Sequence, residues 1–314
     1  MKSRPGGLWL IAALAMLASA GCTTRDTPPP EKDQALATRI EQLVDQVLAA
    51  EDDTKQNSVL ADARAIFERE GVPSVARVGD AAAYGFVLIN MLAQPPEFRL
   101  QFFARMQEVA ARQELPADAV TFAAARRRQT EIEDRYRGRS PSHPQLRDEI
   151  SRLLKEDQAV RQREGFDFKK MEQMDRRTGR PLKAILDRYG VPTYDMVGVQ
   201  AAKDFVVMVQ HQPAEFRAAV LPKLKANVDA GQGEPGSYAM VYDRTQRDQG
   251  RNQLYGQNFE CGAGKQFEVA PLDEPASVNT RRAEMGLMRL ELYGRLLRLH
   301  SPDMCKSAGL TATS

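Results

Sequence analysis

The spacing of apolar and polar residues is helical along most of this chain. Residues 197–211 are apolar on nearly every side, as expected of a buried central helix. Within them, Ala201, Phe205 and Met208 recur at helical intervals. No segment alternates apolar and polar residues clearly enough to require a sheet. The pattern therefore predicts a mainly α-helical protein.

The residues after this central helix predict further helices. Pro213 ends the central helix, and residues 215–230 have an amphipathic pattern. Ser237 is expected to cap a helix that runs to about Gln249. Residues 250–275 are glycine-rich and irregular, and residues 279–300 predict one final helix.

Two stretches of the chain share a series of residues. Residues 71–99 and 190–217 both contain GVP, VG, AA, FV and QP-EFR in that order, with one single-residue gap. The offset of about 119 residues is too long for a solenoid repeat and suits a small domain. We therefore predict two tandem, duplicated helical domains, the second containing the glycine-rich loop. Their predicted limits are a degenerate first repeat at 36–137, a linker at 138–146, a second repeat at 147–300 and a tail at 301–314.

The first 21 residues have the pattern of an export signal. Lys2 and Arg4 precede an apolar stretch at 8–18, which is too short for a permanent membrane span. The small residues at 19–21 lead into Cys22 and resemble the lipobox of bacterial lipoproteins, although Ser19 replaces the usual Leu. That resemblance implies cleavage before Cys22 and acylation of its thiol, so that the lipid bilayer becomes a partner of the mature chain.

A second interpretation of the same segment is cleavage by ordinary signal peptidase. Ala18-Ser19-Ala20 is an A-x-A site, which would leave Cys22 as a plain thiol. In the lipoprotein interpretation, Thr23 in place of Asp implies sorting to the outer membrane, on its periplasmic face. Residues 22–35, with three consecutive prolines, are then a tether.

The charge of the chain argues against nucleic acid as a partner. The chain has 44 basic and 42 acidic side chains, and removal of residues 1–21 leaves 42 of each sign. The basic run at 126–128 is followed by Glu131, Glu133 and Asp134, as on a solvated, salt-bridged helix face. The chain also lacks the spacing motifs of metal sites and phosphate-binding loops. We therefore expect no metal and no cofactor.

The second repeat resembles a bacterial family of domains of unknown function, number 6624 of that series. The resemblance covers about residues 150–295 and rests on the order and spacing of several short pieces. The sequence departs from the family at Val191, where Trp is frequent, near Asn258, where Thr is frequent, and near Asn279, where Asp is frequent. The resemblance implies a domain and candidate residues, but no reaction. The pieces are Asp157-Gln158 with Arg161, Asp175, Gly190-Val191-Pro192, Val197-Gly198, Gln210-His211, Asp243-Arg244, Gln253-x-Tyr255-Gly256-Gln257, and Arg281-Arg282 through Gly286-Leu287 to Tyr293.

Comparison of the repeats gives a candidate functional cluster in the second. The polar set is His211, Asp243, Arg244, Gln253, Tyr255 and Gln257, and its counterparts in the first repeat are Leu92, Ala125, Arg126, Arg135, Arg137 and Arg139. One interpretation is a site in the second repeat with the first as a scaffold. The other is a buried hydrogen-bond network with a purely structural role.

Two classes of function are compatible with this cluster. The first is a non-enzymatic helical module that binds an envelope protein or a small ligand. The second is a hydrolase-like enzyme with His211 as base, Asp243 as its orienting partner, and Arg244 with Tyr255 holding an anionic group.

Cys261 and Cys305 are the other two cysteines of the chain. Export to an oxidising compartment favours a disulfide between them. Such a bond would tie the glycine-rich loop to the end of the chain. It would close a loop of about 44 residues, worth roughly 4 kcal/mol in a chain-entropy model.

Overall fold

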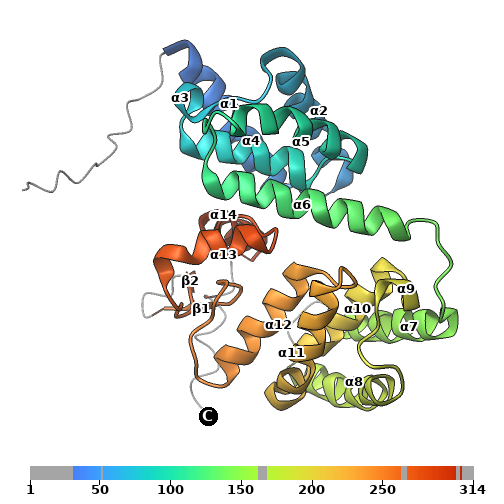
Figure 1. Ribbon diagram of the computed structural model, residues 1–314. Helices are drawn as coiled ribbons and strands as arrows, with labels where there is room; N and C mark the ends of the chain where they lie inside the picture. Colours follow the sequence, from blue (N-terminus) through green and yellow to red (C-terminus); the bar gives the residue numbers. More distant parts are fainter. Residues whose placement is uncertain (1–30, 51, 162–167, 263–266, 302–304, 306–314) are drawn as a thin grey trace, which may run out of the picture.

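The computed structural model describes residues 31–50, 52–161, 168–262, 267–301 and 305. Within them the chain forms fourteen α-helices and one two-stranded sheet, so the prediction of a mainly α-helical fold is confirmed (Figure 1). The predicted export signal, Cys22 and most of the tether lie outside the described residues. Each helix in the described part is too short or too polar to cross a bilayer.

The helices form two groups with the same order of elements (Figure 1). In each group the fourth helix is central and packs against the first and the sixth. The first group is α1 (Glu31–Ala49), α2 (Asp53–Glu70), α3 (Val75–Val78), α4 (Asp80–Leu92), α5 (Pro96–Ala110) and α6 (Ala117–Tyr136). The second is α7 (Pro144–Arg161), α8 (Phe168–Tyr189), α9 (Tyr194–Val197), α10 (Val199–Gln210), α11 (Ala214–Asp229) and α12 (Pro235–Asp248).

The glycines shared by the two repeats occupy equivalent turns. Gly79 and Gly198 precede the central helices with φ of 81° and 83°, in the left-handed region that favours glycine. The backbone N–H of each glycine donates the last hydrogen bond of a short helix, to Val75 or Tyr194, and the buried helix begins at the next residue. This matching geometry is what a duplication predicts, and common descent of the two groups stays a prediction.

Each group has its own apolar core, and α6 contributes to both. Its first half packs Ala119, Phe122 and Ala123 into the core of the first group. Further along, Ile132 belongs to the core of the second group. Gln129 reinforces this contact, since its side-chain amide donates to the hydroxyl of Tyr194 over 3.0 Å. The helix therefore runs along the boundary of the two groups (Figure 1).

The last part of the chain returns to the first group. After α12 come β1 (Phe259–Cys261) and β2 (Phe267–Val269), an antiparallel pair, then η1 (Pro275–Ser277), α13 (Val278–Glu284) and α14 (Leu290–His300). Helix α13 packs against α6, and α14 packs against α1. The predicted disulfide is confirmed, because Cys261 of β1 is bonded to Cys305.

Several predicted boundaries were wrong. The single helix predicted at 279–300 is broken between α13 and α14, because Gly286 has φ of 66° and Arg289 is extended. Helix α1 begins at Glu31 within the predicted tether, and α7 begins at Pro144 within the predicted linker. Ser237 does not cap α12, which begins at Pro235. The Ser237 hydroxyl instead donates to Glu234.

Candidate functional site

Asp243 organises the loop that follows α12. Its side chain is fully buried, and its two carboxylate oxygens accept hydrogen bonds from the backbone N–H groups of residues 254, 255 and 257 over 2.8–3.1 Å. Burial raises the pKa of Asp243, and these backbone hydrogen bonds oppose the rise. The carboxylate therefore holds the loop from one side.

Arg282 holds the same loop from the other side. Its buried guanidinium donates to the carbonyl oxygens of Tyr255 over 2.6 Å and Gly256 over 3.3 Å, and lies 4.9 Å from the ring centre of Tyr293. Burial lowers the pKa of Arg282 to about 10. The loop thus lies between a buried anion, which binds its N–H groups, and a buried cation, which binds its carbonyls.

The other polar residues of this loop also bind the backbone or pack locally. The Gln253 amide donates to the carbonyls of Asn258 and Ala270 over 2.9 and 2.8 Å. Tyr255 packs edge-on against Tyr242 at 5.9 Å. The Nε2 of Gln257 is buried and has no hydrogen-bond partner in the part of the chain that the structure describes. The contacts of Asp243 and Gln253 therefore organise the loop and do not reach His211.

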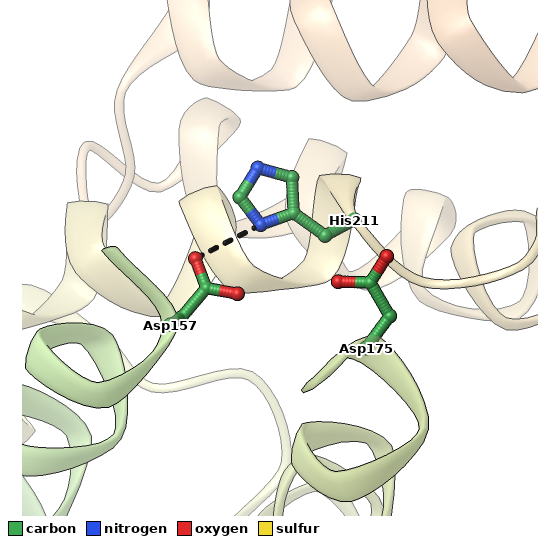
Figure 2. A group of neighbouring side chains, drawn as sticks. All are labelled: Asp157, Asp175 and His211. Atoms are coloured by element: carbon green, nitrogen blue, oxygen red, sulfur yellow. Dashed lines mark ion pairs between the residues drawn. The ribbon is translucent and has the colours of Figure 1, made fainter. Parts of the chain in front are cut away.

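The carboxylate beside His211 is Asp157 and not Asp243. His211 follows the last residue of α10, and its Nδ1 lies 3.2 Å from the Oδ2 of Asp157 on α7 (Figure 2). Asp157 is 1% exposed, whereas the His211 side chain is 11% exposed. The ring is not well aligned for a hydrogen bond, and Nδ1 has no other partner among the described residues. Nε2 points away from both Asp157 and Asp175 (Figure 2).

Arg161 joins Asp157 to Asp175 and completes the cluster. Its Nε and Nη2 donate to the two oxygens of Asp157, each over 3.0 Å, and Nη2 also pairs with Asp175 on α8. Burial raises the pKa of Asp157, but the contacts with His211 and Arg161 outweigh it and lower that pKa to about 2. Asp157 is therefore a carboxylate at neutral pH.

Arg217 fixes the backbone on both sides of His211. This residue of α11 is almost fully buried, and its Nη1 donates to the carbonyls of Gln210 and Gln212. The same guanidinium pairs with Asp248 and donates to the hydroxyl of Thr245, both on α12. The backbone of His211 is thereby tied to α11 and α12, while its ring lies against α7.

Arg244 lies next to this cluster without an acidic partner. It precedes Thr245 on α12, and no ion pair or hydrogen bond of its side chain occurs within the described residues. Its side chain is exposed, and the neighbouring protein lowers its pKa, mainly by removing part of the solvent around it and secondly by repulsion from Arg217. Arg244 is therefore a cation with spare capacity to bind an anion.

Asp157, Asp175 and His211 could each offer one atom to a metal ion, since these atoms lie within 4.8 Å of one another. The bonding pattern argues against that use. Arg161 already pairs with both carboxylates, so its guanidinium satisfies the charge that a bound cation would otherwise balance. The geometry favours a histidine held by an ion-pair network.

The cluster contains residues that the comparison of the repeats did not single out. Asp157, Arg161 and Asp175 belong to the family-like pattern, but they lie upstream of the segment compared for polar differences. One feature of the sequence could have identified all three. They are polar residues on helix faces whose other side chains point to the core. The comparison of the repeats also matched Gln253 with Arg135. That match was wrong, because Arg135 still belongs to α6, whereas Gln253 lies beyond the end of the equivalent helix α12 at Asp248.

The fold and this cluster define a mainly α-helical domain with a histidine beside a buried carboxylate at the end of its central helix. A model of a family of unknown function, DUF6624, matches residues 144–301, which is half of the chain. The chain belongs to this family. No curated protein and no solved structure was found to match it.

Proposed function

We propose that the chain is an exported lipoprotein, anchored by acylated Cys22 to the outer membrane at its periplasmic face. The support is the signal-like sequence at 1–21, the lipobox-like residues before Cys22 and the balanced charge of the remaining chain. The bonded pair Cys261–Cys305 suits an oxidising compartment.

Replacement of the acylated thiol tests the anchor. In a Gram-negative host, Cys22→Ser should stop lipid attachment, and the protein should leave the membrane fraction or accumulate as a precursor. Thr24→Ser is the matched control, because it changes a residue of the same segment, keeps the Cys22 thiol and the disulfide, and should leave fractionation unchanged. Mass spectrometry of the native N-terminus checks the assignment, and an unlipidated Cys22 in the wild type would contradict it.

We further propose that the family domain is a non-enzymatic module that binds a small anionic ligand beside His211. The observation that carries this is a histidine whose Nδ1 faces a buried, ionised Asp157, next to an arginine with no acidic partner. Nε2 of His211 and the guanidinium of Arg244 are then the groups that would contact the ligand.

Substitution of the two contact groups tests this site. With inorganic phosphate as the probe, His211→Gln and Arg244→Gln should each weaken binding about tenfold in calorimetry, the scale of one charge-assisted hydrogen bond. Melting temperatures should change by only a few degrees. Arg180→Gln on α8 is the control, since Arg180 is exposed and has no ion pair among the described residues. Phosphate binding that neither site variant alters would contradict the proposal.

A hydrolase-like enzyme is the second candidate, and the His211–Asp157 pair favours it. In such an enzyme Asp157, whose Oδ2 lies 3.2 Å from Nδ1, would orient the ring so that Nε2 could accept a proton, which is the role expected of Asp243. Turnover of a phosphate ester that is lost in both His211→Gln and Asp157→Asn would support an enzyme over a binding module.

A further inference from the structure

A second, separate surface lies in the groove between the two helical groups. The groove has a volume of about 970 Å³ and is lined by residues of α6 on one side and of α11, α12 and α13 on the other. This is at the upper end of the size of small-molecule sites. None of the residues of the His211 cluster lines it.

Two arginines on the α6 wall of this groove lack acidic partners. Arg128 and Arg135 both line the groove and are exposed. Within the described part of the chain, neither forms an ion pair or a hydrogen bond through its side chain. They are seven positions apart, so they lie on one face of α6, separated by about 10.5 Å along the helix axis.

The acids of α6 near these arginines are paired elsewhere, and the exposed Glu284 of α13 lines the opposite side of the groove. Glu131, one turn from both, pairs with Arg127 over 2.7 Å. Glu133 pairs with Lys203, and Asp134 pairs with Arg137. The expected salt-bridged face of α6 therefore exists, but it leaves Arg128 and Arg135 uncompensated.

The rest of the groove lining could pack against an apolar surface of a ligand. Small or apolar side chains belong to this lining, including Ala124, Ala125 and Val228. On the far wall Lys225 is paired with Asp229, so this lysine adds little net charge. The groove thus combines an apolar lining with two cations on the α6 wall and one exposed acid, Glu284, on the α13 side, none of which has an ion pair among the described residues.

We propose that this groove binds an amphipathic helix of a partner protein that carries acidic side chains seven positions apart. Such a helix lying along α6 repeats its charges at the spacing of Arg128 and Arg135, and its apolar face would cover the small side chains of the lining. Charge complementarity selects an acidic partner and sets the orientation of the helix.

The test uses a labelled synthetic helix with Glu at two positions seven residues apart and Leu and Ala on the same face. Fluorescence anisotropy with the full chain should show saturable binding that weakens at least tenfold in the double variant Arg128→Glu with Arg135→Glu. Arg180→Glu, the same charge change on α8, should leave binding unchanged. Wild-type binding should also weaken as salt is raised, because exposed charges are screened.

Three outcomes would overturn the proposal. One is equal binding of the peptide to the wild type and the double variant. Another is equal binding of a control peptide with Lys in place of both Glu residues. The third is binding of a free dicarboxylate as tightly as the acidic peptide, which would assign the groove to a small molecule. Circular dichroism of the double variant confirms that its helices are retained.

Discussion

Asp243→Ala is expected to lower the free energy of unfolding by about 3–5 kcal/mol, the scale of removing one partner from a buried charged network. The substitution leaves the N–H groups of residues 254, 255 and 257 without their acceptor. It also removes a negative charge that raises the pKa of buried Arg282. Urea denaturation followed by circular dichroism measures the change.

Asp229→Ala provides the matched control for this experiment. Asp229, the last residue of α11, forms an ion pair with Lys225 that is exposed on both sides, so its loss should cost under about 1 kcal/mol. Asp243 would have to be reassigned to the binding site if Asp243→Ala kept the wild-type midpoint and lost phosphate binding. The two readouts therefore separate a structural residue from a ligand contact.

The helical architecture could be predicted because local patterns determine it. The apolar run at 197–211 is buried as α10, with only its ends shifted to Val199 and Gln210. The end of the chain could not be predicted in the same way. The residues around Gly286 have acceptable helical spacing, but the chain must turn there for α13 and α14 to reach α6 and α1. Tertiary packing decides that break.

The partners in the cluster could not be predicted from spacing. His211 was correctly placed at the end of a buried helix, but the acid beside it comes from α7, 54 positions upstream. Asp243 and Arg244 are adjacent on α12 and point in different directions, so one serves the loop and the other lies near Arg217. The residue types therefore predicted which side chains could belong to a site, but only the packing of the helices shows which of these side chains contact one another.

The segment that matches the family is not sufficient to bury its own apolar surface. Ala283 of α13 belongs to the core of the first helical group, and Met288, Leu292 and Leu296 pack against that core. Arg289 adds polar contacts, since its guanidinium pairs with Asp118 over 2.6 Å and its backbone N–H donates to the hydroxyl of Tyr84 over 2.8 Å.

Residues 144–314, which keep both cysteines of the disulfide, are accordingly expected to lose stability when produced without residues 31–143. The uncovered apolar face of α13 and α14 should bind a hydrophobic dye and promote association. Dye fluorescence, sedimentation and thermal melting measure this against the chain from residue 31 onward. Co-expression with residues 31–143 should restore a soluble complex, because it supplies the missing core. A monomeric fragment 144–314 that melts cooperatively at the temperature of the longer chain would show instead that α13 and α14 need no cover.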